Sequence, residues 1–371
     1  MDKYKIYYDA NFAVNEHRGM GKYINNFTNV LHNSFGLECI GLLTGNQKKN
    51  EMQYRSFGFS NYIFWEQFSL LKYRNDHKGI MIFPYNTAPI FLKKTPYNVL
   101  IVHDLIFFKK YETKSLKQKI GKLYRRLVLP RIISKFDHIV TVSEHTRTEM
   151  KNFFNLDASK ISVLPNSIIL KKNFEDDNPK FEYRDNYFFH IGGEPSYKNS
   201  LSVLYAFSGL GEDIRSNYKL KIIGIRDPKA LCQYQNVADQ LKIRSQIEFL
   251  KYQTDAQIIE LYKRAKMFIF SSFEEGFGIP ILEAFKYGCP LLCSNSSCFP
   301  EIANDGGNYF DPNNAHDIAN VIMRVLAEPN QTKAKVLKGY DRVKAYSFDS
   351  FSNLATKWFE RNLGNIQDCT N

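Results

Sequence analysis

Two carboxylates, Glu275 and Glu283, frame a glycine-rich turn in the second half of the chain. The apolar run Met267–Phe270 before the turn predicts a buried strand, and Pro280 after it fits the first turn of a helix. A loop between a strand and a helix presents backbone N–H groups at the positive end of the helix dipole, where phosphate or sugar oxygens can bind. The spacing lets both carboxylates face one crevice, although a glycine-rich turn can also be purely structural.

Two further loops carry residues suited to an anionic ligand. Lys198 and Asn199 follow an expected strand at Tyr187–Ile191, and the lysine offers a compact positive charge to a phosphate. Gly19 and Gly21 follow the first expected strand and open a helix, so the backbone there can approach a ligand closely. Alone, each loop is equally compatible with a simple turn or a surface lysine.

His103 ends an apolar run that predicts a buried strand at Asn98–His103. In open α/β sheets, ligands bind at the carboxyl ends of the strands, so a histidine at this position is a candidate for the site. A single histidine is otherwise more often structural.

Apolar runs and helical segments alternate along the chain, which predicts an α/β fold with mostly parallel sheets. The other expected strands are Lys5–Asp9, Glu38–Leu43, Gly79–Phe83, His138–Val142, Lys219–Ile223, Ile247–Phe249 and Pro290–Cys293. The expected helices include Tyr23–His32, Ser200–Leu210, Asp255–Arg264, His316–Leu326 and Phe348–Leu363.

The polar segment 171–185 divides the chain and is predicted to be an interdomain linker. We therefore expect a first domain at 1–170, a second at 186–345 and a C-terminal segment at 346–371. The acidic run inside the linker is expected to be solvated, because such runs in linkers rarely bind metals.

Composition limits the classes of protein to consider. The chain has 371 residues, 44% of them hydrophobic, which is enough for two packed domains. No apolar run has the length of a membrane-spanning helix, and the N-terminus does not have the pattern of a secretory signal, so we expect a cytoplasmic protein. Six cysteines do not suggest a disulfide scaffold. The net charge of +12 favours phosphorylated ligands, anionic membranes or nucleic acid as partners.

The turn and its surroundings resemble the donor-binding signature of glycosyltransferase family 4, the retaining GT-B enzymes. The matching residues are Glu275–Pro280, Glu283-Ala284, Gly288, Pro290 and Pro300-Glu301. The resemblance covers nearly the whole chain and is strongest from about Tyr187 to Pro312. It implies two Rossmann-like domains facing a cleft, with a C-terminal helix that crosses back to the first domain.

The resemblance also implies roles for individual residues. Glu283 would hold the ribose hydroxyls of a nucleotide-sugar, and Glu275 would hold the sugar and stabilise positive charge at the reacting carbon. His103 would lie near the transferred sugar. The remaining donor-binding positions are backbone or loop residues: Gly19, Gly21, Asn199, Gly276, Phe277, Gly278 and Ile279.

Lys198 matches the family's catalytic lysine, which stabilises the departing diphosphate. Many members also carry an arginine shortly before it, and here Gly193 and Tyr197 occupy the corresponding positions. Arg226 is the candidate to replace that arginine, the alternative being Lys198 with backbone amides alone. We expect no metal ion or other cofactor, since preorganised cations and amides can stabilise the growing charge on the phosphate.

The stretch Leu105–Phe136 contains ten basic residues and a single acid, Glu112. Four apolar residues recur within it at helical spacing: Leu116, Ile120, Leu123 and Leu127. Basic amphipathic helices are typical of proteins that bind anionic membrane surfaces, so we expect peripheral association with the inner face of the cytoplasmic membrane. The alternative is that the apolar stripe packs on its own domain.

The resemblance therefore implies a retaining hexosyltransferase that uses a nucleotide-sugar donor. The loop sequences look most like those of bacterial enzymes that build O-antigen or capsule chains, so the expected acceptor is a lipid-linked oligosaccharide or polysaccharide. The first choice of donor is GDP-mannose; rhamnosyl, glucosyl or galactosyl transfer from dTDP- or UDP-sugars stays open. A glycan phosphorylase, a sugar-nucleotide epimerase and a basic nucleic-acid-binding protein are the rival classes, but the chain shows neither a pyridoxal-phosphate site nor a nucleic-acid motif.

Overall fold

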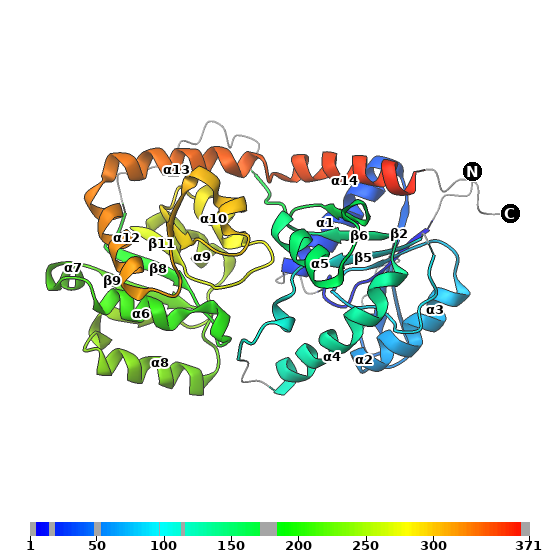
Figure 1. The fold of residues 1–371 in the computed structure, drawn as a ribbon, viewed down its shortest axis with the longest axis horizontal. Coiled ribbons are helices and arrows are strands. Elements are labelled where there is room, and N and C mark those ends of the chain that lie inside the picture. The colour runs from blue at the N-terminus through cyan, green and yellow to red at the C-terminus, as the bar shows by residue number, and fades with distance from the viewer. Residues whose placement is uncertain are drawn as a thin grey trace. The chain divides into compact units, whose positions relative to one another are not determined.

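The computed structural model describes residues 5–14, 19–47, 53–95, 97–112, 116–170 and 184–364 (Figure 1). It divides into two compact units. Unit 1 comprises Met1–Lys109, Ile120–Ser167 and Phe348–Asn371, and unit 2 comprises Lys110–Lys119 and Ile168–Ser347. Most of the expected linker, residues 171–183, lies outside the described residues, as do Arg18 and Lys114.

The described part of unit 1 contains a seven-stranded parallel sheet in the order β3-β2-β1-β4-β5-β6-β7. Its strands are β1 (Lys5–Asp9), β2 (Glu38–Thr44), β3 (Tyr54–Phe57), β4 (Ile80–Phe83), β5 (Asn98–Val102), β6 (His138–Thr141) and β7 (Ile161–Val163). The central strands are continuous apolar runs because helices cover both faces of a parallel sheet. The strand order reverses between β1 and β4, the point at which open α/β sheets bind ligands.

The helices of unit 1 are α1 (Gly19–Phe35), α2 (Tyr62–Phe64), α3 (Leu71–Asp76), α5 (Glu144–Phe154) and α14 (Phe348–Leu363). A π-helical turn, Trp65–Leu70, joins α2 to α3. Helix α4 (Leu116–Ile132) begins in the segment assigned to unit 2 and continues in unit 1. No helix of the described residues is both long and apolar enough to cross a membrane.

Helix α14 packs on α1 through aromatic rings. The rings of Phe27 and Trp358 lie 5.7 Å apart, and those of Phe35 and Phe359 lie 4.7 Å apart. Its bounds are those expected from the apolar spacing of the sequence. The last described helix of the chain is therefore part of unit 1. The chain returns from unit 2 to unit 1 at Phe348, two residues after the start that we expected for the C-terminal segment.

The described part of unit 2 contains a six-stranded parallel sheet in the order β10-β9-β8-β11-β12-β13. Its strands are β8 (Tyr187–Ile191), β9 (Lys219–Ile223), β10 (Ile247–Phe249), β11 (Met267–Phe270), β12 (Leu291–Ser294) and β13 (Gly307–Phe310). Its helices are α6 (Ser200–Ser208), α7 (Glu212–Asn217), α8 (Pro228–Gln240), α9 (Asp255–Arg264), α10 (Ile279–Lys286), α11 (Phe299–Ala303), α12 (Ala315–Ala327) and α13 (Pro329–Lys344). The two parallel sheets confirm the predicted α/β fold.

The end of the expected linker is bound to unit 2. The guanidinium of Arg184 donates to the carbonyl oxygens of Tyr262, Lys263 and Ala265 at 2.9–3.2 Å. These carbonyls end helix α9, where a cation also complements the helix dipole. Arg184 therefore fixes the point at which the chain enters β8.

Candidate functional site

The strand order of unit 2 reverses between β8 and β11, and the loops after these two strands bring Lys198 and Glu275 together. The ammonium nitrogen of Lys198 lies 2.7 Å from Oε1 of Glu275, and the side chains are 22% and 17% exposed. Ser272 donates a second hydrogen bond to the same carboxylate oxygen at 3.0 Å. The two residues expected to be catalytic in this half of the chain thus form one partly buried ion pair.

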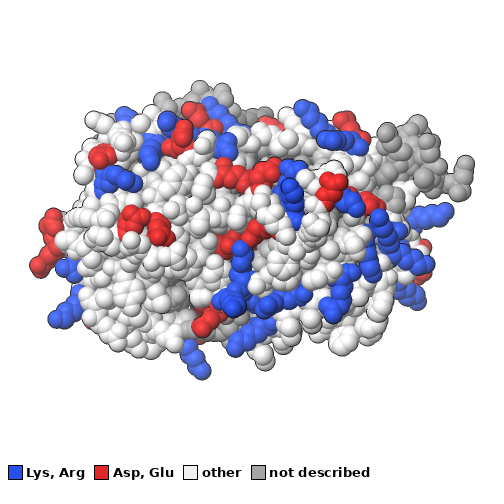
Figure 2. Space-filling view, viewed as in Figure 1, with Lys and Arg blue, Asp and Glu red and all other residues white. Residues whose placement is uncertain are grey.

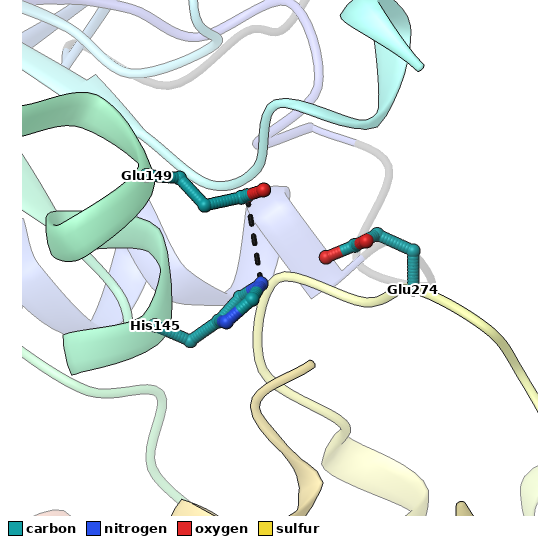
Figure 3. A group of neighbouring side chains, drawn as sticks. All are labelled: His145, Glu149 and Glu274. Atoms are coloured by element: carbon teal, nitrogen blue, oxygen red, sulfur yellow. Dashed lines mark ion pairs between the residues drawn. The ribbon is translucent and has the colours of Figure 1, made fainter. Parts of the chain in front are cut away.

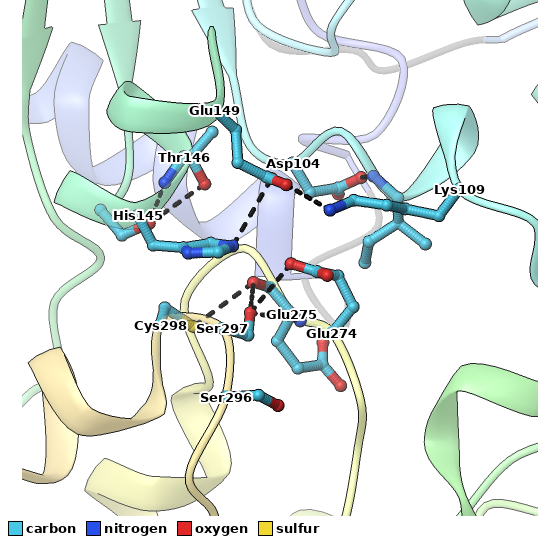
Figure 4. A network of polar contacts seen from close by, with 12 residues as sticks. Asp104, Lys109, His145, Thr146, Glu149, Glu274, Glu275, Ser296, Ser297 and Cys298 are labelled. Atoms are coloured by element: carbon cyan, nitrogen blue, oxygen red, sulfur yellow. Dashed lines mark hydrogen bonds and ion pairs between the residues drawn. The ribbon is translucent and has the colours of Figure 1, made fainter. Parts of the chain in front are cut away.

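The backbone of Glu275 is held by the loop that follows β12 (Figure 4). Its amide donates to Oγ of Ser297 at 3.1 Å, and the Ser297 hydroxyl lies 2.8 Å from its carbonyl oxygen. The thiol of Cys298 donates to the same carbonyl oxygen. Sequence reasoning did not single out Ser297 for this role, because it lies 22 residues after Glu275 and is not among the residues that match the family signature.

A short 3₁₀ turn positions Lys198 at the start of helix α6. Asn199 ends this turn with φ of 54°, the left-handed conformation that asparagine tolerates. Its side-chain amide donates to the carbonyl oxygens of Ser271 at 3.2 Å and Pro312 at 2.7 Å. Both amide N–H groups are thus used inside the protein, where they fix the lysine loop, and the expected contact of Asn199 with the donor stays a prediction.

A pocket of about 520 Å³ lies beside this loop. Its described lining residues all belong to unit 2 and come mainly from the loops after β8 and β9: Gln118, Gly192, Gly193, Glu194, Pro195, Tyr197, Lys198, Gly224, Arg226 and Asp227. The pocket therefore brings Arg226, the expected second cation, to the same space as Lys198. Glu194 was not singled out in the sequence, although it stands in the same loop as Lys198.

Glu283 lies in helix α10 and has a different partner from Glu275. The hydroxyl of the buried Tyr262 in α9 donates to its Oε2 at 3.1 Å. Burial and the nearby carboxylate raise the pKa of Tyr262 well above its usual value, so the phenol stays protonated and keeps donating. Neither Glu275 nor Glu283 is among the described residues that line the pocket.

The turn between Glu275 and α10 combines a buried side chain with a glycine in an unusual conformation. Gly278 has φ of 90° and precedes the helix, a backbone state that residues with a Cβ rarely adopt. The side chain of Phe277 is 4% exposed, and its ring packs on that of Tyr346 at 5.4 Å. Any contact of Phe277 with a ligand would therefore use its backbone, and Gly276 and Ile279 flank it in the same turn.

In unit 1, the two glycines expected at the site open helix α1. A Cβ on Gly21 would lie 2.2 Å from the carbonyl oxygen of Phe12, so this glycine is required for packing against the loop that follows β1. Gly19 is the first residue of the helix and is exposed. This close approach explains why position 21 needs a glycine. Among the described residues, no comparably close contact is found at Gly19.

His103 follows β5 and is held rigidly in the neutral state. Its Nε2 lies 2.9 Å from the carbonyl oxygen of Pro84, so this nitrogen carries the proton and Nδ1 carries the lone pair. Burial lowers the pKa of His103 to about 4. The ring also packs edge-on against Tyr23 at 5.2 Å. His103 can therefore accept a hydrogen bond through Nδ1 at neutral pH, but it does not carry a positive charge there.

Helix α5 begins next to the end of β6 with a well-formed cap. Ser143 accepts a hydrogen bond from the amide of Thr146 at 3.1 Å and so satisfies the first turn of the helix. His145 stands in this first turn, and its Nε2 lies 3.5 Å from Oε2 of Glu149, one turn further along the helix (Figure 3). These residues had no assigned role in the sequence, and the structure shows them as a cap and an ion pair along one helix face.

Two family models match the chain. Residues 171–342 match the model described as Glycosyl transferases group 1, and residues 61–172 match the model described as Glycosyltransferase Family 4. The matches are contiguous, so together they span residues 61–342 and include the loops of Lys198, Arg226 and Glu275.

Curated relatives include two bacterial enzymes. The chain is 27% identical over 289 residues to O-antigen chain mannosyltransferase RfbU of Salmonella typhimurium, which covers 78% of this chain and 75% of the relative. It is 29% identical over 221 residues to O-antigen chain mannosyltransferase B of Escherichia coli, which covers 57% of each chain.

Solved structures share the fold at low identity. Sucrose-phosphate synthase from Thermosynechococcus elongatus superposes with a TM-score of 0.74 at 14% identity, over 98% of this chain and 100% of that chain. Anabaena HepE in complex with UDP-glucose superposes with a TM-score of 0.71 at 11% identity, over 96% of this chain and 100% of that chain. At these identities the likeness shows the fold alone.

Proposed function

Because the chain belongs to glycosyltransferase family 4, whose enzymes have the GT-B fold, we propose that it transfers a hexose from a nucleotide-sugar to a growing surface glycan with retention of configuration. The first choice of donor is GDP-mannose, since the bacterial relatives RfbU and mannosyltransferase B are named O-antigen chain mannosyltransferases. The acceptor would be a lipid-linked oligosaccharide or polysaccharide. Rhamnosyl, glucosyl and galactosyl transfer remain the alternatives.

The observation that carries this proposal is the Lys198–Glu275 pair at the strand-order reversal of unit 2. When a nucleotide-sugar reacts, negative charge grows on the diphosphate and positive charge grows on the sugar carbon. Lys198 is suited to the first charge and Glu275 to the second, and the two groups are already held in contact. The ribose would be held by Glu283, and the sugar hydroxyls by the amides of the turn at 276–279.

Arg226 supports the proposed diphosphate site, since it lines the same pocket as Lys198. Two cations and the amides of helix starts can neutralise a diphosphate without a metal ion, so we propose a reaction that needs none. His103 would accept a hydrogen bond from a sugar hydroxyl through Nδ1, consistent with its neutral state. Gly19 would bring the start of α1 close to the ligand.

The proposed site of membrane contact is helix α4. Its apolar stripe is exposed on the described surface: Leu116 71%, Ile120 49%, Leu123 58% and Leu127 47%. Lys and Arg side chains gather over this helix in the view of Figure 2. An exposed apolar stripe flanked by cations favours binding to an anionic bilayer, and each cation near the surface contributes about 1 kcal/mol.

A second group of exposed apolar side chains lies on the segment that α4 contacts. Phe64 and Phe68 are 52% and 58% exposed, and their rings stack with centroids 6.2 Å apart. The π-helical turn that carries Phe68 is tied to α4, because Gln67 donates to the hydroxyl of Tyr124 at 2.6 Å. We therefore propose a protein that acts at the inner face of the cytoplasmic membrane, where lipid-linked acceptors are reached.

The test is a binding and hydrolysis screen of the purified protein against UDP-, GDP- and dTDP-sugars in the presence of EDTA. Thermal stabilisation by one nucleotide family, with slow release of the sugar, is expected, and the anomeric configuration of the product by NMR tests retention. Glu275→Ala should bind nucleotide and release no sugar. Stabilisation that appears only when Mg²⁺ or Mn²⁺ is added would overturn the metal-independent mechanism. A salt-sensitive gel shift with nucleic acid, without nucleotide-sugar binding, would favour the rival class.

A further inference from the structure

A carboxylate, Glu194, lines the pocket beside the cations Lys198 and Arg226. Like charges repel, so an unengaged carboxylate there would weaken the binding of a diphosphate. The position of Glu194 therefore requires a physical explanation that the expected roles of the loop residues do not provide.

The carboxylate of Glu194 is engaged by two successive backbone amides. Its Oε1 accepts hydrogen bonds from the amides of Arg226 at 2.6 Å and Asp227 at 3.0 Å. Burial acts to raise the pKa of Glu194, but these hydrogen bonds act in the opposite direction and hold it below its usual value. Glu194 is thus ionised at neutral pH, and its charge is directed at the segment that opens helix α8.

The two loops that Glu194 joins approach each other closely. Gly224 has φ of 95°, and a Cβ there would lie 2.6 Å from the carbonyl oxygen of Gly192. The hydroxyl of Tyr234 in α8 donates to the carbonyl oxygen of Gly193 at 3.2 Å. The loop after β8 and the loop after β9 are therefore joined on both sides of the Glu194 contact.

The side chain of Arg226 is placed by a second contact. Its guanidinium carbon lies 5.9 Å from the ring centroid of Tyr252, within the range of a cation–π interaction. The ring of Tyr252 is 68% exposed, so this contact by itself is weak. The backbone of Arg226, fixed by Glu194, is then the main constraint on where the guanidinium lies.

We propose that Glu194 is a positioning residue for the diphosphate of the donor: it holds the Arg226 loop against the Lys198 loop, so that both cations act on one ligand. This inference rests on the proposed function, because it takes a nucleoside diphosphate as the ligand. Neither Gly193 nor Tyr197 carries a positive charge, so a second cation beside Lys198 would come from the neighbouring loop, which Glu194 holds in place.

The test compares Glu194→Gln with Glu194→Ala in the full-length protein. Glutamine keeps a carbonyl oxygen that can accept from both amides, whereas alanine removes the acceptor. We expect Glu194→Gln to bind GDP and UDP within about threefold of the wild-type affinity. We expect Glu194→Ala to bind the preferred nucleotide about tenfold more weakly and to raise KM for the nucleotide-sugar more than it lowers kcat. Glu260→Ala, which removes an exposed carboxylate from α9, is the control for net charge.

A double mutant shows whether Glu194 acts through Arg226. If it does, adding Glu194→Ala to Arg226→Ala should weaken nucleotide binding by less than twofold further. Full additivity would overturn the proposal, as would tighter binding by Glu194→Ala, which would mean that the carboxylate repels the ligand. Equal losses in the Gln and Ala variants would also overturn it, because the negative charge of Glu194, and not its acceptor oxygen, would then be what nucleotide binding needs. Wild-type protein that binds no nucleotide would refute the proposed function, and this inference with it.

Discussion

Lys198 and Glu275 are 77 residues apart in the chain, yet the ammonium nitrogen of one lies 2.7 Å from a carboxylate oxygen of the other. Both side chains are largely buried, and Ser272 donates to the same oxygen. The pair is a property of the sheet of unit 2, because β8 and β11 are neighbours and their loops leave the same edge. Each residue holds the other in place before any ligand binds.

We predict that Glu275→Ala abolishes sugar transfer while the protein still unfolds cooperatively. Removing this carboxylate leaves Lys198 partly buried without its ion-pair partner, so a loss of about 1–3 kcal/mol in stability is also expected. Transfer is measured with radiolabelled donor, and stability by thermal unfolding. Glu274→Gln is not a suitable control, since Glu274 also contacts Ser297; Glu260→Ala serves instead. Near-normal transfer by Glu275→Ala would contradict the assignment.

Glu283→Ala should weaken nucleotide binding without preventing folding. Tyr262→Phe should have a smaller effect in the same direction, because it removes only the hydroxyl that orients the Glu283 carboxylate. Isothermal titration with GDP and UDP measures both effects, and we expect losses of about tenfold and two- to fivefold, since a hydrogen bond to a charged group contributes about 1.5–3 kcal/mol. If Tyr262→Phe were the more damaging change, the assignment of Glu283 as the nucleotide contact would be wrong, because the buried tyrosine would then do more than orient that carboxylate.

Two glycines in unit 1 provide a matched pair. Gly21→Ala places a Cβ 2.2 Å from the Phe12 carbonyl oxygen and should destabilise unit 1 by about 2–4 kcal/mol. Gly121→Ala in helix α4 meets only the end of the Arg125 side chain, at 3.4 Å, and should stabilise by about 0.5–1 kcal/mol because alanine favours helix. Thermal and urea unfolding separate the two. Equal stability of both variants would mean that the close approach of α1 is not maintained in solution.

We predict that the stability of the fold depends on pH through the buried carboxyl group of Asp9. Its side chain is 2% exposed and accepts a hydrogen bond from Tyr62 at 2.8 Å. Burial raises the pKa of Asp9 to about 7, although the hydrogen bonds from Asn11 and Tyr62 act to lower it. Since the folded pKa lies above the unfolded value of about 4, its contribution to stability is greatest below pH 4 and is lost as the pH rises to about 7.

Asp9→Asn removes this titration and keeps an oxygen for the two donors of Asn11. The variant should therefore unfold at a higher temperature than wild type at pH 8, and the difference should shrink at pH 5. The measurement is thermal unfolding across this range, with Asp213→Asn on the surface as the control. A difference that is independent of pH would show that Asp9 is ionised throughout, stabilised by its hydrogen bonds.

We predict that the protein binds anionic vesicles through helix α4. Leu123→Ser with Leu127→Ser removes the centre of the exposed stripe, and Lys119→Glu with Arg126→Glu reverses two cations. We expect either pair to reduce sedimentation with phosphatidylglycerol vesicles by at least fivefold, and the wild type to ignore phosphatidylcholine vesicles. Leu337→Ser, a 41% exposed leucine on α13, is the control for lost surface hydrophobicity. Wild-type protein that does not bind anionic vesicles at low salt would remove the membrane proposal.

The interior strands of both sheets were predictable because they contain apolar runs. The interior strands β1, β8, β9 and β11 have the expected bounds, as does the edge strand β10, and β12 is shifted by one residue. Three of the described strands escaped prediction: β3, β7 and β13. All three lie at the edges of their sheets, where one side is unpaired and the pattern is mixed, as in the Tyr54–Phe57 segment with two exposed residues.

The sequence by itself determined the two-domain α/β class, the loops that hold Lys198 and Glu275, and the amphipathic character of α4, because these depend on local patterns of residue type. Only the tertiary structure decided which of these residues meet. It paired Lys198 with Glu275, used the amide of Asn199 inside the protein and placed Glu194 on the backbone of Arg226. Such contacts depend on the order of strands in the sheet, which brings together loops that are far apart in the chain.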